Sequence, residues 1–241
     1  MLIIPGGGYG NICSDREGEP IALAYLEKGF NSFVLHYRVG ESYDIYPCQL
    51  VDAARAVLNI KSNAEKYNIN PQRVFTVGFS AGGHLAGSLG LMSHDEELLS
   101  ILGVKPEEIS IRGMVLAYPV VTALTDTHKR SFERLLGVPF EEIPLEVKKK
   151  LSLEELVDEN SPPAFIWHTA TDAEVPAVGS LMLCNKYIEK KVPVSLRIYP
   201  YGPHGIALAD KFTNYSESGV QIQSLAQSWL SDSVDFINTL K

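Results

Sequence analysis

This sequence has few cysteines, fewer basic than acidic residues and no long apolar run. The three cysteines, Cys13, Cys48 and Cys184, form no CxxC pair, so their spacing predicts neither a disulfide framework nor a zinc site. Lys and Arg number 21 against 29 Asp and Glu, which gives a net charge of −8. A chain this acidic lacks the positive surface of a protein that binds nucleic acid or an anionic membrane, and we expect a small, neutral substrate instead.

Membrane and targeting signals are also missing. No apolar run in the sequence approaches the roughly 18 residues that a membrane-spanning helix needs. The N-terminus shows no basic region followed by an apolar stretch and a cleavage site, as a secretory signal would. We therefore expect a cytoplasmic protein without a membrane partner. Because Met1 runs straight into Leu2-Ile3-Ile4, as if inside a strand, a processed or shortened N-terminus stays open.

Short apolar runs alternate with helical patterns along the whole chain of 241 residues. Most of these runs are continuously hydrophobic, as is typical of parallel strands covered on both faces. The expected strands are Leu2–Pro5, Ser32–Tyr37, Arg73–Gly78, Gly113–Tyr118, Ala164–Thr169 and Val194–Tyr199, and the expected helices are Pro20–Lys28, Cys48–Tyr67, Ala81–Met92, Pro176–Lys191 and Ser218–Leu240. The alternation predicts an α/β fold with a doubly wound, mostly parallel sheet of about six strands, in a single domain over residues 1–241.

The stretch 121–160 interrupts this alternation. It is rich in charge, including Lys148-Lys149-Lys150, and has short helical patterns near Lys129–Leu136 and Pro144–Val157. Two interpretations stay open for it: a solvated excursion between two strands, or a small cap over the substrate.

The strongest local signal is Gly78-Phe79-Ser80-Ala81-Gly82-Gly83, which lies between an expected strand and an expected helix. In such a strand–turn–helix context a GxSxG motif forms a nucleophile elbow, with small residues that let strand and helix approach and a serine exposed at the apex. We therefore expect Ser80 to be a nucleophile.

A nucleophilic serine needs a base, and the base needs a carboxylate to orient it. Asp172 follows the expected strand Ala164–Thr169, and His204 follows the last expected strand. Both therefore lie at the carboxyl ends of parallel strands, in the order serine, acid, histidine of the α/β-hydrolases. Among acidic alternatives to Asp172, Glu174 is the nearest, and Asp158 and Asp210 are more distant.

The remaining histidines have weaker claims to be the base. We expect His36 to belong to a strand and His84 to pack on the helix after Ser80. His168 closes the strand before Asp172, and His94 and His128 lie in polar, surface-like stretches.

A glycine loop, Pro5-Gly6-Gly7-Gly8-Tyr9-Gly10, follows the first strand. Consecutive glycines let backbone amides face a developing oxyanion, so the amides of Gly7, Gly8 and Ala81 are the expected donors. A dinucleotide-binding turn is the alternative, but Asn11 stands where GxGxxG needs glycine, and the next strand ends in His36-Tyr37-Arg38 without the acidic residue that holds a ribose.

With these motifs together, the chain resembles the acetyl-esterase and acetylxylan-esterase-like group of the α/β-hydrolases. The resemblance covers nearly the whole sequence. It rests on PGGGYG at the start, DREGEP from Asp15, GFSAGGHLA around Ser80, SPPAFIWHTATDAEVP around Asp172, and GPHG around His204. It implies a serine carboxylesterase that removes short acyl groups, notably acetyl groups of xylo-oligosaccharides or similar carbohydrates, with no metal or organic cofactor.

The chain departs from the usual fold of this group because it lacks one or two strands before the first. The strand Ser32–Tyr37 should therefore lie near an edge of the sheet, and a homodimer or a missing N-terminal piece would cover that edge. Next to the expected site loops stand Tyr9, Tyr118, Val175 and Tyr201, which we expect to line a substrate pocket.

Two further functions stay open. Aryl-formamidases and prolyl-peptidase catalytic domains resemble the elbow and the D-x-x-V-P segment, which points to amide or peptide hydrolysis, although 241 residues leave no room for a gating propeller. A non-catalytic receptor on the same fold is the third alternative, and the loss of one triad residue would favour it.

Overall fold

In the computed structural model, which describes residues 1–40 and 45–240, the described strands form one sheet that is parallel throughout. Its order is β2-β1-β3-β4-β5-β6. The strands are β1 (Leu2–Ile4), β2 (Phe33–Val34), β3 (Phe75–Phe79), β4 (Gly113–Ala117), β5 (Ala164–Thr169) and β6 (Val194–Tyr199). The six-stranded doubly wound sheet and the edge position of β2 are thereby confirmed.

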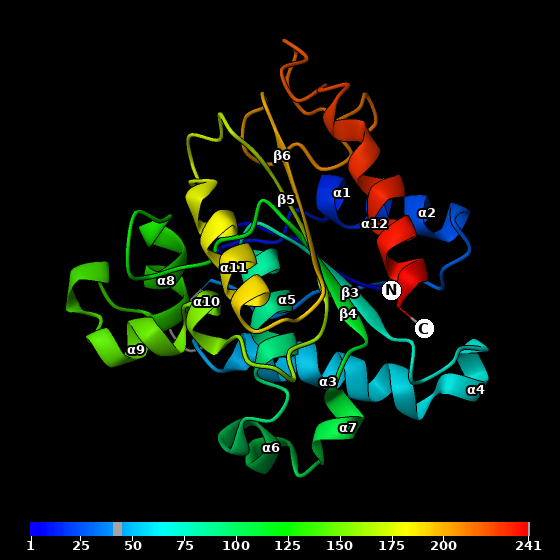
Figure 1. Cartoon of the computed structure of the whole chain (residues 1–241), viewed down its shortest axis with the longest axis vertical. Helices are drawn as coiled ribbons and strands as arrows, with labels where there is room; N and C mark the ends of the chain where they lie inside the picture. The colour runs from blue at the N-terminus through cyan, green and yellow to red at the C-terminus, as the bar shows by residue number, and fades with distance from the viewer. Residues whose placement is uncertain (41–44, 241) are drawn as a thin grey trace.

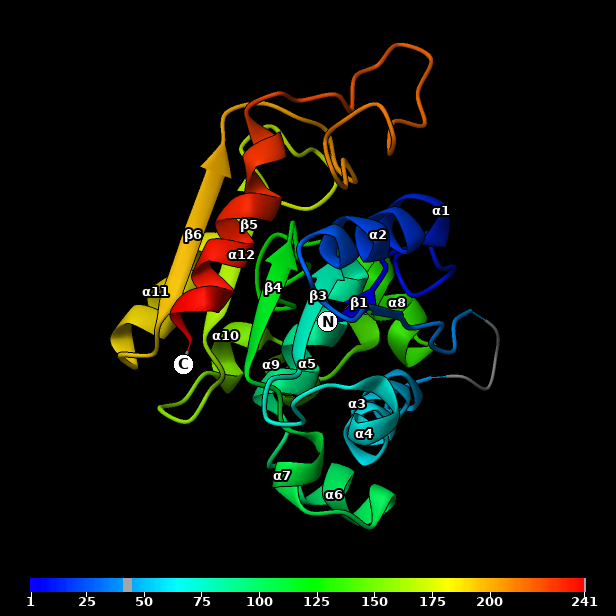
Figure 2. The same cartoon turned by 90° about the vertical axis from the view of Figure 1, so that its right-hand side faces the viewer.

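Helices cover both faces of the sheet (Figures 1 and 2). One face carries α2 (Glu19–Glu27) and α12 (Trp229–Thr239), and the other carries α3 (Cys48–Ser62), α5 (Ala81–Leu91), α10 (Leu153–Leu156) and α11 (Val178–Glu189). The shorter helices are α1 (Ser14–Glu17), α4 (Ala64–Tyr67), α6 (Glu96–Leu102), α7 (Pro106–Ile109), α8 (Lys129–Leu136) and α9 (Leu145–Lys150), with 3₁₀ turns η1 (Phe140–Glu142) and η2 (Ala226–Ser228). None of the helices in the described part of the chain is both long and apolar enough to cross a membrane.

The continuous apolar runs are explained by two hydrophobic cores, one on each face of the sheet. Successive side chains of a strand point to opposite faces. In β5, Ala164 and Ile166 pack in the core with α5 and α11, whereas Phe165 and Trp167 pack in the core with α2 and α12. The Trp167 ring stacks on Trp229 of α12, with 5.2 Å between ring centroids.

The last helix begins later than the sequence pattern predicts, at Trp229 rather than near Ser218. Ser216 and Ser218 form a local hydrogen-bonded turn, and Gly219 adopts a left-handed backbone with φ 68°. Such turns compete with helix formation. The segment between β6 and α12 is therefore a long loop, and it carries His204 to the end of the sheet.

The segment 121–160 packs against the sheet's helices and also reaches the glycine loop. Phe132 and Leu135 of α8 and Leu153 of α10 are buried in the core on the α5 face. Also on α8, the Arg134 guanidinium lies against the Gly8–Gly10 backbone. One side of the segment is thus packed, and its α8 end borders the site described below.

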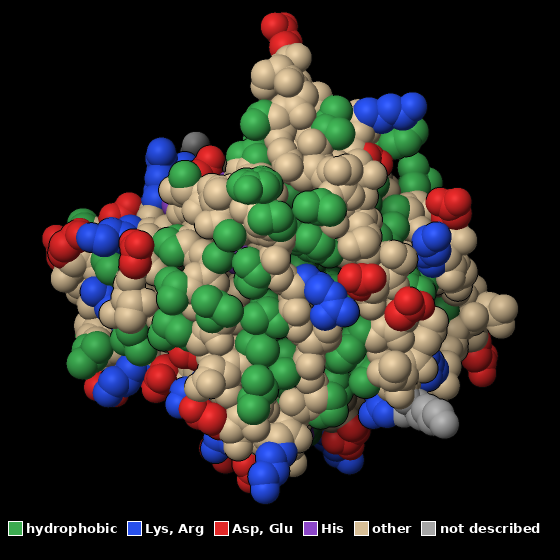
Figure 3. Space-filling model, turned by 45° about the horizontal axis from the view of Figure 1, so that its top comes forward, with side chains coloured by type: hydrophobic (Ala, Val, Ile, Leu, Met, Phe, Trp, Pro, Cys, Tyr) green, Lys and Arg blue, Asp and Glu red, His purple; other side chains and the backbone are tan. Residues whose placement is uncertain are grey.

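Hydrophobic side chains also gather in the middle of the face shown in Figure 3. Exposed apolar residues of α11 and β6 include Leu181, Ile188 and Ile198, which are 50%, 63% and 38% exposed. The expected homodimer stays a prediction, and β6 is a second edge strand of the sheet beside β2.

Candidate active site

The serine elbow joins β3 to α5 through a strained backbone. Ser80 has φ 52° and ψ −120°, a conformation that non-glycine residues rarely adopt. The chain there is so close to its neighbours that a Cβ on Gly78 would lie 2.2 Å from the Gly82 carbonyl oxygen, and one on Gly82 would lie 2.2 Å from that of Ile4. Only glycines let α5 pack on β1 and β3 in this way, which fixes Ser80 at the carboxyl end of the sheet.

The structure brings Ser80, His204 and Asp172 together in one chain of hydrogen bonds. Ser80 Oγ lies 2.7 Å from His204 Nε2, and His204 Nδ1 lies 2.6 Å from Asp172 Oδ2. The Asp172 carboxylate can only accept, so His204 Nδ1 carries the proton and Nε2 is free to accept one from the serine. This is the arrangement in which an imidazole acts as a general base toward a hydroxyl.

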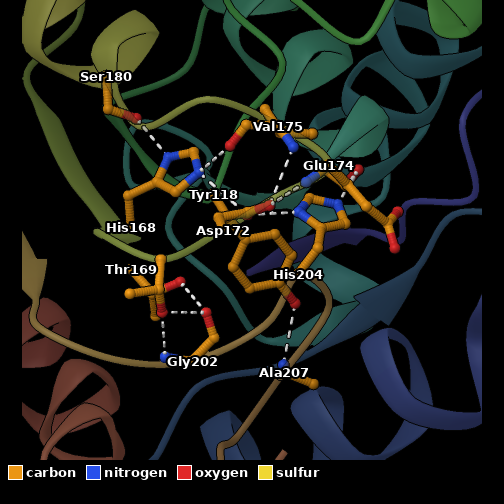
Figure 4. A network of polar contacts seen from close by, with 12 residues as sticks. Tyr118, His168, Thr169, Asp172, Glu174, Val175, Ser180, Gly202, His204 and Ala207 are labelled. Atoms are coloured by element: carbon orange, nitrogen blue, oxygen red, sulfur yellow. Dashed lines mark hydrogen bonds and ion pairs between the residues drawn. The ribbon is translucent and has the colours of Figure 1, made fainter.

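Asp172 is held by more partners than the sequence indicates (Figure 4). Its Oδ1 accepts hydrogen bonds from the amides of Glu174 and Val175, each at 2.9 Å, and its Oδ2 also lies 3.2 Å from His168 Nε2. Burial opposes the charge of this side chain, but the hydrogen bonds from His168 and His204 outweigh it and lower the pKa of Asp172. The carboxylate is therefore ionised throughout the physiological pH range.

Two of the three acidic alternatives to Asp172 lie outside the cleft. Asp158 and Asp210 each cap a local turn, through Asn160 and Phe212 respectively. Glu174 borders the cleft beside the triad without a hydrogen bond to His204.

The pKa of His204 is governed by opposing effects. Burial disfavours the imidazolium, whereas the hydrogen bond and the charge of Asp172, with weaker contributions from Glu17 and Glu174, favour it. The net result raises the pKa of His204 above its ordinary value of 6.5. A base of this strength suits proton abstraction from a serine near neutral pH.

The glycine loop lies directly beside Ser80. A Cβ on Gly6 would lie 2.9 Å from Ser80 Cβ, and Gly7 and Gly8 adopt φ values of 127° and 60°. Within the described ranges, the amides of Gly7, Gly8 and Ala81 donate no hydrogen bond to another protein group. These donors are therefore available to an oxygen bound at Ser80.

Glu17 supports this loop, a role that sequence reasoning missed. Its Oε2 accepts a hydrogen bond from the Gly6 amide, and its Oε1 accepts one from Tyr118 Oη, both at 2.8 Å. Burial, reinforced by the nearby Glu17 charge, raises the pKa of Tyr118 well above 10.0, so its hydroxyl remains a donor. The same hydroxyl accepts the Ala207 amide at 2.9 Å, and the Tyr118 ring meets that of His204 edge-on. Glu17 and Tyr118 thus join the glycine loop to the histidine loop.

A cleft of about 270 Å³ opens at Ser80. Of the residues expected to line it, Val175 does so. Tyr9, Tyr118 and Tyr201 do not, and these expectations are corrected. Tyr9 and Tyr118 are buried and hold structural hydrogen bonds, Tyr9 to His84 Nδ1 at 2.7 Å, while Tyr201 is 67% exposed outside the cleft. Burial lowers the pKa of His84 to about 4, in keeping with its expected packing role.

The cleft also contains residues that the sequence did not single out. His128, Arg130 and Arg134 come from the α8 end of the segment 121–160, and Arg16 and Tyr215 come from α1 and the loop before α12. His128 was expected at a polar surface, yet it borders the cleft with its Nδ1 bonded to Ser131 Oγ at 2.8 Å. No cluster of three or more His, Cys, Asp or Glu side chains in the described residues is placed to hold a metal ion.

The parallel sheet and the serine elbow, with acid and histidine on the loops after β5 and β6, define a member of the α/β-hydrolase superfamily. Within it, the model of the BD-FAE family matches residues 1–187, so the chain belongs to that family.

Individual relatives are ester hydrolases or proteins of xylan breakdown. The chain is 39% identical over 216 residues to endo-1,4-beta-xylanase B of Butyrivibrio fibrisolvens, covering 87% of this chain and 33% of that protein. It is 27% identical over 216 residues to the acetylxylan esterase of Xylanibacter ruminicola, covering 89% and 42%. The chain thus spans less than half the length of each of these two relatives. Its fold matches the carboxylesterase Cest-2923 of Lactobacillus plantarum with a TM-score of 0.86 at 25% identity, covering 99% of this chain and 84% of that one.

Proposed function

We propose that this chain is a serine carboxylesterase that removes short acyl groups, in the first place acetyl groups, from carbohydrate hydroxyls. The observation that carries the proposal is the hydrogen-bonded series Ser80–His204–Asp172, beside three amides that have no acceptor among residues 1–40 and 45–240. Nucleophile, base, orienting acid and oxyanion donors are the complete set for acyl transfer.

In the proposed reaction, Ser80 Oγ attacks the ester carbonyl while His204 Nε2 takes the hydroxyl proton. The carbonyl oxygen becomes an oxyanion that accepts hydrogen bonds from the amides of Gly7, Gly8 and Ala81. His204 then gives its proton to the alcohol oxygen, the bond from carbon to that oxygen breaks, and an acyl group stays on Ser80. Water then attacks the acyl carbon while His204 takes its proton. The bond from that carbon to Ser80 Oγ breaks, Oγ takes the proton from His204, and the carboxylic acid leaves.

The lining of the cleft supports a small acyl group and a polar alcohol. Charged and polar side chains dominate it, and its apolar contributions are confined to residues such as Val175 and Tyr215. A long acyl chain would need a continuous apolar channel to leave water. Acetylated carbohydrate also agrees with the name of the acetylxylan esterase relative.

Amide and peptide hydrolysis and ligand binding without catalysis are the alternatives. The same triad can hydrolyse amides, but a leaving amine depends more on protonation by the general acid than a leaving alcohol does. The rates of ester and amide hydrolysis therefore distinguish an esterase from an amidase. A receptor would keep the fold without turnover.

The test is hydrolysis of p-nitrophenyl acetate, butyrate and octanoate, followed by acetate release from acetylated xylo-oligosaccharides. We expect the acetate ester to be hydrolysed fastest, and Ser80→Ala and His204→Ala to lose at least about 10⁴-fold in kcat. His94→Ala is the matched control, because His94 is an exposed histidine away from the cleft. Equal rates for wild type and Ser80→Ala on every ester would overturn the proposal, and turnover of aryl formamides alone would favour the amidase.

A further inference from the structure

The wall of the cleft contributed by α8 has an arrangement of charge that ester hydrolysis alone does not require. Arg130 and Arg134 both border the cleft that contains Ser80. They are one helical turn apart, so their side chains lie on the same face of α8. Two like charges at this spacing destabilise a helix unless an anion lies between them.

Neither arginine forms an ion pair within the described residues, whereas three lysines of the same segment do. Lys129, Lys149 and Lys150 pair with Glu141, Glu146 and Glu97, at 3.0, 3.1 and 2.7 Å respectively. By contrast, Arg130 and Arg134 have no carboxylate partner in residues 1–40 or 45–240.

Glu133, beside Arg134, is already engaged. Its Oε1 accepts the Phe140 amide at 3.2 Å, which turns that oxygen toward the 3₁₀ turn after α8.

Arg134 is also fixed in place against the glycine loop. Its Nη1 lies 3.4 Å from the Gly8 carbonyl oxygen, and its Cζ would lie 2.7 Å from a Cβ on Gly10. Burial and then the charge of Arg130 lower the pKa of Arg134, and the charge of Glu133 partly opposes them. A guanidinium held in this way offers its remaining N–H groups at little further cost in side-chain entropy.

The other charges of the cleft leave this cationic wall intact. Glu17 is occupied by the Gly6 amide and Tyr118, and Arg16 lies over the Tyr215 ring, with its Cζ 4.5 Å from the ring centroid. Glu174 borders the cleft too, and its charge acts on His128 and His204.

We propose that Arg130 and Arg134 form a subsite for a carboxylate on the alcohol part of the substrate, so that the preferred esters are acetylated sugars that carry an acidic group. This inference rests on the proposed esterase function and extends it to the charge of the substrate, which sequence reasoning expected to be neutral. Because the acyl group is small, the carboxylate belongs to the sugar. The planar, bidentate guanidinium is well suited to a carboxylate.

The experiment compares two substrates that differ only at the anionic group: methyl tri-O-acetylglucuronoside and the methyl tri-O-acetylglucoside with a free primary hydroxyl. The readout is the ratio of the two kcat/KM values, so a general loss of activity cancels. For the wild type we expect a ratio of at least ten in favour of the uronoside, falling as salt is added. Arg130→Gln and Arg134→Gln should each lower this ratio about tenfold, the scale of a charge-assisted hydrogen bond.

Lys149→Gln is the matched control, since it removes one positive charge from the same segment outside the cleft. Its ratio should equal that of the wild type. Arg134→Lys keeps the charge and tests whether the guanidinium itself matters, with an intermediate ratio expected. A wild-type ratio of one or less, with Ser80-dependent hydrolysis of p-nitrophenyl acetate intact, overturns the carboxylate subsite and leaves the esterase standing.

A binding measurement separates the two proposals if no ester is hydrolysed. Calorimetric titration of Ser80→Ala with methyl glucuronoside and methyl glucoside should show tighter binding of the uronoside, lost in Ser80→Ala/Arg130→Gln. That preference without turnover would refute the esterase and keep the subsite. Equal binding of both sugars would refute the subsite.

Discussion

His168 Nε2 lies 3.2 Å from Asp172 Oδ2, the oxygen that also accepts the proton of His204 Nδ1 at 2.6 Å. His168 is fully buried at the end of β5, and its Nδ1 lies 2.9 Å from Ser180 Oγ on α11. Because Nε2 also faces the Val175 carbonyl at 3.0 Å, this nitrogen is the donor. His168 thus helps to orient the Asp172 carboxylate, which in turn orients His204 (Figure 4).

Removal of this second histidine should weaken catalysis mainly through the position of Asp172. We expect His168→Ala to lower kcat about tenfold, the equivalent of one hydrogen bond to a charged group, with little change in KM. His168→Gln, which keeps a donor, should recover part of the loss. Without His168, Asp172 would also interact more strongly with the His204 imidazolium and raise the pKa of His204. The acid limb of the pH profile of kcat/KM should therefore move to higher pH. An unchanged limb together with an equal loss in both variants would mean that His168 only fills space.

The raised pKa of His204 sets the pH dependence of the proposed reaction. Proton abstraction requires the neutral imidazole, and the imidazolium accumulates as pH falls through the pKa of His204. Activity should therefore decline on the acid side with a midpoint above 6.5. Asp172→Asn removes the charge that raises this pKa, so its midpoint should move to lower pH. Its kcat should fall about 10⁴-fold, because the imidazole is no longer held in the right tautomer. A wild-type midpoint below 6.5 in a kcat/KM profile would contradict this account.

Glu17 should be required for the fold of the glycine loop rather than for proton transfer. Its two oxygens face two donors, the Gly6 amide and the Tyr118 hydroxyl. Glu17→Gln places an NH₂ group against one of them, which leaves a buried donor unpaired at a cost of about 1–3 kcal/mol. Thermal or urea unfolding should show that loss of stability.

Glu19→Gln is the control for this change, because Glu19 is an exposed neighbour on α2. It should unfold like the wild type. Equal stability of Glu17→Gln and Glu19→Gln would show that the buried carboxylate is dispensable.

The frame of the site was predictable from sequence because each of its parts is a local pattern. The continuous apolar run before Ser80, the small residues around it, and the loops that end β5 and β6 each depend on neighbouring residues. The order of the parallel strands then brings Asp172 and His204 to the carboxyl end of the sheet, where Ser80 lies.

The wall of the cleft was not predictable in this way. Arg134 reaches Gly8 across 126 positions of sequence, and its segment shows only a charged, helical pattern that suits a solvated surface equally well. Tyr118 was singled out for its position after β4, yet a hydroxyl there can face the cleft or the interior. Its bonds to Glu17 and Ala207 come from packing between distant loops, which no local pattern specifies.

The last prediction concerns the backbone at Ser80, where the serine needed for activity lowers the stability of the fold. With φ 52° and ψ −120° at this residue, the Cβ of serine is strained, and such strain is worth about 1–3 kcal/mol. Alanine keeps the Cβ, whereas glycine removes it and relieves the strain, although its freer unfolded chain returns about 0.4–1 kcal/mol of the gain. Ser80→Gly and Ser80→Ala should therefore both be inactive, with Ser80→Gly the more stable by about 1 kcal/mol in urea unfolding. The opposite order of stability would show that the elbow stores no strain in its serine.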